Sequence, residues 1–234
     1  MLPLLPVIAH ATDDENGEYQ LNINPHVKAT DQLSTFGNFG YFYDPHQYSK
    51  FRFGWPGLIY RANSWLQFPG GLDAYYTDNF GSANTLELRP FAGVKFFVPN
   101  KAKITLYNYT RYEYRSTENQ DTGQWNGYSR IRSRFGTEFP LTARACAWKP
   151  RTFYALTDVE LFYRFDKDAL EPLRVRGGVG YVMSDRVRAE LIYTAEFDQS
   201  SPGISLTYNH SALRLNVSIA LNKGLLGRLL NPSE

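Results

Sequence analysis

The sequence has little cysteine and no long apolar segment, and each shortage excludes a class of protein. One of the 234 residues is cysteine, Cys146. A lone cysteine can form neither an internal disulfide nor a cysteine-based metal site, so we interpret Cys146 as a tolerated thiol in the connection from Leu141 to Pro150. A membrane-spanning helix needs about 20 consecutive apolar residues. The chain has no such run and a mean hydropathy of −0.42, which excludes a helical membrane protein.

The sequence also lacks a concentration of charge of one sign. Its 25 Lys and Arg residues and 23 Asp and Glu residues are interspersed, and the formal net charge is +2. A nucleic-acid-binding protein would gather its basic residues on one face, so we expect no nucleic-acid partner. Aromatic residues, by contrast, are abundant at 16 per cent. The length suits a single domain.

The clearest pattern lies between Lys103 and Phe139, where the side chains alternate with a period of two. In Lys103–Arg115 one parity carries Ile104, Leu106, Tyr112 and Tyr114, and the other carries Lys103, Thr105, Arg111, Glu113 and Arg115. The segment Arg130–Phe139 repeats the arrangement, with Arg130, Arg132, Arg134 and Glu138 opposite Ile131, Phe135 and Phe139. A period of two predicts β-strands with one apolar and one charged face.

Alternation alone does not separate a soluble sheet from a membrane barrel, but three details favour the barrel. Aromatic residues cluster near the strand ends, as at a bilayer interface. Arginine and glutamate share the charged parity, which suits cross-strand pairs inside a filled lumen. Both segments are also long enough for the roughly 9 to 11 residues that a tilted strand needs to cross a bilayer. We therefore predict an all-β fold: a single antiparallel, up-and-down transmembrane β-barrel of about 10 to 12 strands with a polar, charged lumen.

The same two-sided pattern recurs along the chain. It predicts twelve strands at about Tyr19–Lys28, Thr35–Tyr43, Lys50–Tyr60, Trp65–Tyr76, Thr85–Phe97, Ala102–Arg115, Tyr128–Phe139, Thr152–Phe165, Leu173–Met183, Arg186–Phe197, Gly203–Tyr208 and Leu213–Leu221. The inward parity predicts a lumen charge network, with a structural or a pore role, formed by Glu87, Arg89, Arg111, Glu113, Arg115, Arg130, Arg132, Arg134, Glu138, Asp158, Glu160, Arg164, Arg174, Arg176, Arg188 and Glu190. Prolines inside strands, at Pro56, Pro69 and Pro90, indicate either that the strand boundaries lie elsewhere or that the strands bulge there.

We predict a signal-peptide remnant at residues 1–11, a barrel domain at residues 12–221 and a tail at residues 222–234. The apolar run Leu2–Ile8 precedes Ala9-His10-Ala11, which fits the rule for a cleavage site after Ala11. Predicted connections alternate between short ones, such as Ser184-Asp185, and long ones, such as Ser116–Gly127. Twelve strands would put both termini at the end with the long loops, which conflicts with the periplasmic termini usual in such barrels.

Four stretches of the chain resemble a family of uncharacterised, outer-membrane β-barrel-like proteins classed as a domain of unknown function. They are Leu86–Phe97 (LELRPFAGVKFF), Tyr107–Arg115 (YNYTRYEYR), Tyr128–Leu141 (YSRIRSRFGTEFPL) and Asp158–Phe197. The resemblance implies a barrel in the outer membrane of Gram-negative bacteria, and it implies no activity. The partners expected of such a barrel are outer-membrane lipids, lipopolysaccharide and the barrel assembly machinery. We expect no cofactor.

Some outer-membrane barrels are lipid-acting enzymes that place a Ser beside a His on the barrel wall. The local candidate here is Asn209-His210-Ser211, in a predicted tight turn. Adjacent residues of a strand point to opposite faces, so these residues have a poor geometry for nucleophile and base. We predict no catalytic residue and no metal site. His26 lies on the inward parity without a partner, and His46 lies in a loop.

The inward arginines admit two interpretations: an anion-selecting constriction, or an ion-pairing network that fills a narrow lumen. We favour the network, because five inward carboxylates supply partners and the barrel is small beside open porins of 16 to 18 strands. The aromatic runs Phe36–Tyr43 and Asp73–Phe80 indicate an interface girdle more than a sugar- or lipid-binding platform.

The sequence thus favours an outer-membrane barrel that is a structural protein or a narrow solute passage. A lipid-modifying barrel enzyme is one alternative. The other is a soluble periplasmic ligand-binding barrel of lipocalin type, which would need an apolar interior and a charged exterior.

Overall fold

The computed structural model describes residues 17–99, 104–142, 150–200 and 205–221, and all regular structure among them is β-strand. The strands are β1 (Gly17–Lys28), β2 (Leu33–Asp44), β3 (Tyr48–Arg61), β4 (Leu66–Asn79), β5 (Thr85–Phe97), β6 (Thr105–Asn119), β7 (Trp125–Pro140), β8 (Thr152–Arg164), β9 (Ala169–Leu170), β10 (Leu173–Val182), β11 (Val187–Ser200) and β12 (Ser205–Leu221). The predicted signal segment, Cys146 and the predicted tail lie outside these residues. The described part of the chain contains no helix of the length and apolarity needed to cross a membrane.

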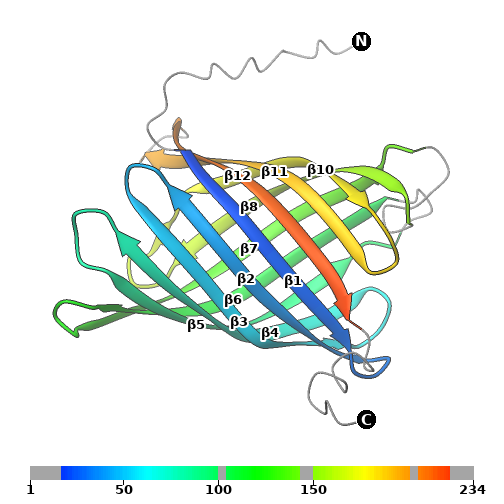
Figure 1. Cartoon of the computed structure of the whole chain (residues 1–234), viewed down its shortest axis with the longest axis horizontal. Helices are drawn as coiled ribbons and strands as arrows, with labels where there is room; N and C mark the ends of the chain where they lie inside the picture. The colour runs from blue at the N-terminus through cyan, green and yellow to red at the C-terminus, as the bar shows by residue number, and fades with distance from the viewer. Residues whose placement is uncertain (1–16, 100–103, 143–149, 201–204, 222–234) are drawn as a thin grey trace, which may run out of the picture.

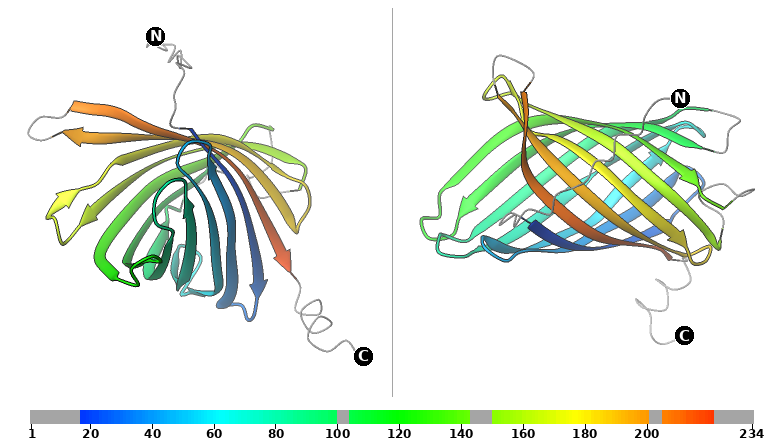
Figure 2. Two further views of the ribbon diagram at one scale, coloured as in Figure 1. Left: turned by 60° about the vertical axis from the view of Figure 1, so that its left-hand side comes forward. Right: turned by 90° about the horizontal axis from the view of Figure 1, so that it is seen from above.

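The strands form a closed barrel (Figures 1 and 2). Neighbours in the chain pair in antiparallel order from β1 to β8, β8 then pairs with β10, and β10, β11 and β12 continue the series. The sheet closes where β12 pairs with β1. The two-residue β9 adds a short pairing to the end of β8. Among the described residues the barrel wall therefore has eleven long strands.

The closure corrects the prediction of an entirely antiparallel barrel. Strands β1 and β12 are parallel, with Tyr19 beside Leu213 and Val27 beside Leu221. In a barrel of sequential hairpins an odd number of strands requires one parallel pair, because the first and last strands then run in the same direction. Figure 1 shows both strands running the same way, so the start of β1 and the end of β12 lie at opposite ends of the barrel. The conflict over the termini came from counting twelve strands.

The miscount arose at Asn209-His210-Ser211-Ala212, which was predicted to be a turn. These residues lie inside the continuous strand β12. Glu196 of β11 faces His210, whereas Phe197 faces Tyr208, so Asn209 is the extra residue of a β-bulge. A bulge absorbs one residue without ending a strand. Similarly, the predicted loop Ser116–Gly127 is largely strand, because β6 runs to Asn119 and β7 begins at Trp125.

Proline disturbs the ladder at Pro56, whereas Pro90 stays in the ladder opposite Leu72. Around Pro56, the pairing of β3 with β4 shifts register between Phe53 and Leu58, and the pairing of β2 with β3 shifts between Phe36 and Asn38. Proline lacks the N–H that a central strand donates, so it is accommodated at a bulge. By contrast, Pro69 stays in the ladder opposite Ile59.

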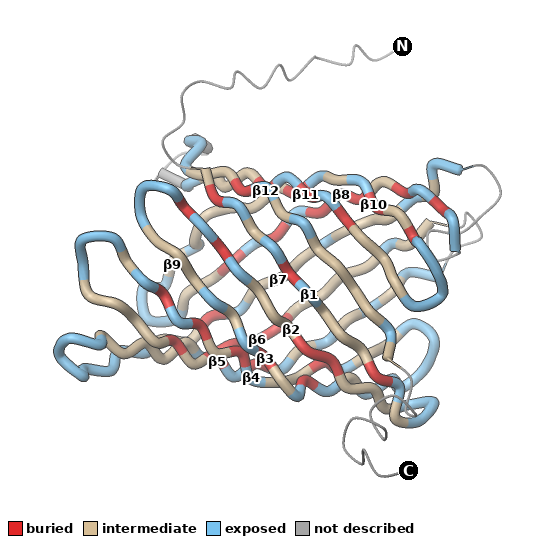
Figure 3. The backbone as a smooth tube through the Cα atoms, viewed as in Figure 1, coloured by how far each residue is buried: buried red, intermediate tan, exposed pale blue. Residues whose placement is uncertain are grey.

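The two parities of the strands separate inside from outside, and buried and exposed positions alternate along the strands (Figure 3). Every long strand exposes large apolar side chains, for example Leu21, Tyr41, Phe53, Leu72, Val94, Tyr112, Phe135, Val159, Val179, Leu191 and Leu215. The buried positions include some apolar residues, but more of them are polar or charged; the charged ones include Asp73, Glu87, Arg89, Arg111, Glu113, Arg130, Asp158, Glu160, Arg176 and Glu190. The interior of this barrel is thus mainly polar.

Candidate functional site

The lumen gathers the charged side chains that the inward parity predicted. Of the sixteen predicted residues, fourteen line the cavities of the lumen, and Glu113 is fully buried beside them. Arg164 differs because it lies at the end of β8, where it pairs with Asp166 at 2.6 Å. Period-two alternation places these charged groups in the lumen, because every second residue of a strand points inward.

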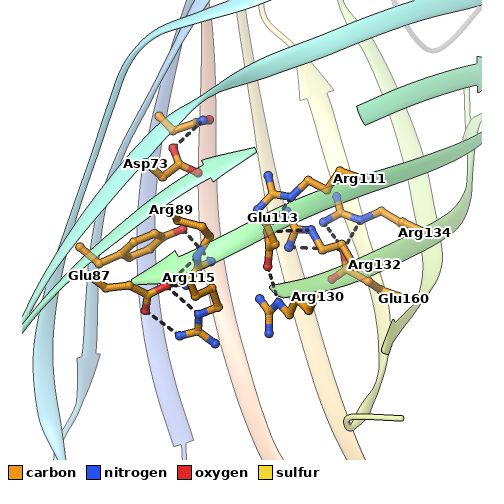
Figure 4. A network of polar contacts seen from close by, with 12 residues as sticks. Asp73, Glu87, Arg89, Arg111, Glu113, Arg115, Arg130, Arg132, Arg134 and Glu160 are labelled. Atoms are coloured by element: carbon orange, nitrogen blue, oxygen red, sulfur yellow. Dashed lines mark hydrogen bonds and ion pairs between the residues drawn. The ribbon is translucent and has the colours of Figure 1, made fainter. Parts of the chain in front are cut away.

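Glu113 is the centre of one cluster (Figure 4). Its carboxylate accepts from the Arg111 guanidinium at 2.6 Å and from Arg130, and Arg132 Nε lies 3.8 Å away. The register explains the contact with Arg130, since this residue of β7 lies directly opposite Glu113 of β6. Three cations therefore share one buried carboxylate.

Glu160 of β8 is the centre of the neighbouring cluster. It pairs with Arg134 at 2.9 Å, with Arg132 at 3.5 Å and with Arg176 at 3.5 Å. Arg176 of β10 also pairs with Asp158 at 2.6 Å. Because Arg132 contacts both Glu113 and Glu160, the ion pairs form one network from β6 to β10.

A second network lies on the wall formed by β3 to β6. Glu87 pairs with Arg89 and with Arg115, each at 2.6 Å. Asp73 accepts from Arg52 at 2.6 Å. A Cβ on Gly54 would lie 2.2 Å from Asp73 Oδ1, so glycine at this position leaves room for the carboxylate.

The period-two rule would have found the inward residues that our sequence interpretation missed. Arg52 lies between Phe51 and Phe53, and Arg214 lies between Leu213 and Leu215. Asp73 was missed because it begins a run that we assigned to the interface girdle. The two aromatic runs in fact divide between the faces: Phe36, Phe42 and Tyr75 are buried, whereas Tyr41, Tyr43 and Tyr76 are exposed.

Two cavities occupy the lumen, with volumes of about 270 Å³ and 350 Å³. The first opens toward the end where β1 begins, and residues near that end, such as Glu18 and Tyr48, line it. The second lies toward the end of β12, with His26 and Ser218 in its wall. Both cavities are lined by Asn22, Arg52, Arg132, Arg134, Arg176 and Arg214. These six residues, here called the central layer, separate the cavities.

Among the described residues, the predicted Ser–His candidate is divided between the two faces of β12. His210 lines the first cavity, whereas Ser211 belongs to the opposite parity and pairs with Ala195 in the ladder. His26 stacks on Phe36 with ring centroids 6.2 Å apart. Within the described residues, no three His, Cys, Asp or Glu side chains are grouped so that they could hold a metal ion.

Comparison with known proteins identifies a family but no activity. No curated protein matches the chain. The model of one family, described as a protein of unknown function (DUF2490), matches residues 12–207. This match spans the barrel from β1 into β12 and confirms the resemblance that the sequence indicated. The chain therefore belongs to the DUF2490 family of proteins of unknown function.

Proposed function

We propose that this protein is an outer-membrane β-barrel of a Gram-negative bacterium, and that it acts as a structural barrel because the central layer closes its lumen. The observation that carries this proposal is the combination of an apolar exterior on all eleven long strands with a charged interior. A barrel in a bilayer needs this arrangement because its outer side chains meet hydrocarbon.

The exterior supports a membrane location in three ways. The long strands have between 10 and 17 residues, and a tilted strand needs roughly 9 to 11 to cross a bilayer. Exposed aromatic residues occur near strand ends, for example Tyr43, Tyr60 and Phe153, where interface girdles lie. An apolar surface of this extent on a soluble protein would cause aggregation. A lipocalin-type soluble barrel would have the reverse arrangement of faces, so the exterior argues against that alternative.

The lumen supports a closed barrel. Arginine side chains of the central layer come from β3, β7, β10 and β12, and ion pairs hold Arg52, Arg132, Arg134 and Arg176 to the wall. Open porins have 16 to 18 strands, compared with eleven here. A lumen of this size, crossed by ion-paired side chains, leaves room for small solutes at most.

A narrow passage for small anions is the second candidate, and the charge of the first cavity favours it. Ten cationic side chains but four carboxylates line that cavity. A surplus of positive charge attracts anions and repels cations. We give less weight to a lipid-modifying enzyme, because His210 and Ser211 occupy opposite faces of β12.

The first test is fractionation of the native host's membranes, followed by gel electrophoresis of the detergent-extracted protein with and without boiling. We expect the protein in the outer-membrane fraction and faster migration of the unboiled sample, because a folded barrel is compact. Lipopolysaccharide and the barrel assembly machinery should co-purify at least transiently. Release of the protein with soluble periplasmic contents would reject the membrane proposal.

Planar-bilayer recording distinguishes a closed barrel from an anion passage. We expect the purified protein to give no single-channel steps, since the central layer closes the lumen. Steps that Arg132→Glu abolishes would replace the closed barrel with the anion passage. A matched control is Lys28→Glu, which reverses an exposed charge at the end of β1 and should leave any conductance unchanged.

A further inference from the structure

Arg214 in the central layer differs from the other arginines there because it has no carboxylate partner among the described residues. Its cross-strand neighbours are Gln20 on β1 and Ile192 on β11, and its Nε donates to Gln20 Oε1. The next inward residues of its own strand are Ala212 and Asn216. By contrast, Arg134 and Arg176 each face a carboxylate directly across the ladder.

The charges that act most strongly on Arg214 are those of other arginines. The guanidinium groups of Arg52, Arg134, Arg174 and Arg176 repel it across the lumen. Each of these four already holds a carboxylate, so their own partners neutralise them in part. A cation enclosed in a lumen without a carboxylate beside it is costly, since it loses hydration and gains no opposite charge in return.

The central layer also contains buried N–H groups that have no hydrogen-bond acceptor within the part of the chain that the structure describes. Arg52 Nε and Arg132 Nε are buried and have no hydrogen-bond acceptor in the described structure. Arg214 lines both cavities, so its guanidinium is reached from either side of the layer. Unsatisfied buried donors in a polar cavity indicate an acceptor that would complete them.

We propose that the centre of the lumen is a binding site for a small oxyanion, held by Arg214 with Arg52 and Arg132. The planar guanidinium group presents paired donors that match the oxygens of phosphate or carboxylate. A spherical halide cannot use that geometry. The first cavity, of about 270 Å³, could hold several water molecules at the roughly 30 Å³ each occupies in the liquid, so an ion of the size of phosphate with its hydration fits. This inference concerns the lumen alone and does not depend on a membrane location.

The test uses the full chain, folded in a zwitterionic detergent, with inorganic phosphate as the probe. Isothermal titration calorimetry and the unfolding temperature are measured in phosphate and in chloride at equal ionic strength. We expect saturable binding of phosphate and a rise in the unfolding temperature that chloride does not reproduce, because a ligand that binds only the folded state stabilises it. Acetate in place of phosphate separates carboxylates from tetrahedral anions.

Arg214→Gln should weaken phosphate binding at least tenfold. It should also leave the unfolding temperature in phosphate-free buffer unchanged or higher, since it removes a charge that four arginines repel. A purely structural role of Arg214 would instead lower that temperature. The matched control is Lys95→Gln, which removes one positive charge from the second cavity but lies outside the first; it should keep the phosphate response.

Three results would overturn the inference. One is a wild-type protein that shows no saturable response to phosphate, and this result needs no variant to fold. Another is an equal loss of binding in Lys95→Gln and Arg214→Gln, which would mean that the general positive field of the lumen attracts the anion. The third is an Arg214→Gln variant that is folded and binds phosphate as the wild type does.

Discussion

Glu113 illustrates how single residues hold this lumen together. It is fully buried, and three guanidinium groups from β6 and β7 surround its carboxylate. A buried ion pair gains little net free energy because both ions lose their hydration. Removal of one partner alone, such as Glu113, is nevertheless costly, since the remaining charges stay buried without compensation. The lumen network therefore behaves as a unit whose members depend on one another.

We predict that Glu113→Gln lowers the free energy of unfolding by about 3 to 5 kcal/mol, the range measured when one partner of a buried pair is removed. Arg111, Arg130 and Arg132 would then repel one another without an anion between them. Urea unfolding of the refolded protein, followed by the migration shift on unboiled gels, measures the change. Asp121→Asn, which neutralises an exposed carboxylate in the turn between β6 and β7, should change little. Equal effects of the two substitutions would contradict the role of Glu113.

At the scale of elements, β10 shows that glycines in one strand have different tasks. Gly180 lies under the ring of Tyr154, and a Cβ there would be 2.2 Å from Tyr154 Cζ. This close approach lets the Tyr154 hydroxyl donate to Glu190 at 2.7 Å. A Cβ on Gly177 of the same strand would meet nothing within 4 Å. The first glycine is required by packing and the second is not.

Gly180→Ala should therefore destabilise the barrel by about 1 to 3 kcal/mol, the usual cost of overpacking a filled site. Gly177→Ala should be neutral or slightly stabilising, because alanine loses less backbone entropy than glycine. Unfolding midpoints in urea compare the two variants directly. If both substitutions had the same effect, the contact with Tyr154 would not explain the glycine at position 180.

The outer face of β11 offers a test of the surrounding medium. Leu191 lies within the strand with 48 % of its surface exposed, and Leu141 lies just beyond β7 with 56 % exposed. In a bilayer, Leu191→Arg should cost about 2 to 4 kcal/mol and Leu141→Arg about 0 to 1 kcal/mol, since the penalty depends on depth. Folding titrations in lipid vesicles measure both. In a soluble barrel neither substitution should destabilise, which would contradict the membrane proposal.

At the scale of the whole molecule, the parallel pairing of β1 with β12 sets the positions of the chain ends. Eleven long strands put the start of β1 and the end of β12 at opposite ends of the barrel. The turn between β6 and β7, which contains Gly123, lies at the end of the barrel where β1 begins. The chain crosses the barrel six times from the start of β1 to this turn, and an even number of crossings returns it to the same end. Five strands separate that turn from Leu221, so the two sites lie at opposite ends.

Epitope tags test this arrangement in cells. One tag is inserted at Gly123 and another, in a separate variant, directly after Leu221. If the barrel spans the outer membrane, an antibody added to intact cells should label one variant and not the other. Permeabilised cells serve as the control for expression. Labelling of both variants, or of neither, on intact cells would instead fit the twelve-strand topology that the sequence indicated.

The sequence predicted the parts of this fold that depend on local alternation. It predicted most of the strands, the two faces and many of the charged residues of the lumen, because each follows from the period of two along a strand. Arg130, Arg132 and Arg134, for instance, share a parity whatever their partners are. Pro56 likewise indicated a strand boundary or a bulge, since the missing N–H is a property of the residue itself.

The sequence alone could not decide what depends on partners distant in the chain. Asn209-His210-Ser211 is polar enough to form a turn, and only the ladder with β11 shows that it continues a strand across a bulge. The parallel closure and the strand number follow from that one element. Which arginine has a carboxylate is likewise a matter of register: Arg134 faces Glu160, whereas Arg214 faces Gln20 and Ile192. Parity is local to a strand, but register and closure arise only when the strands pair.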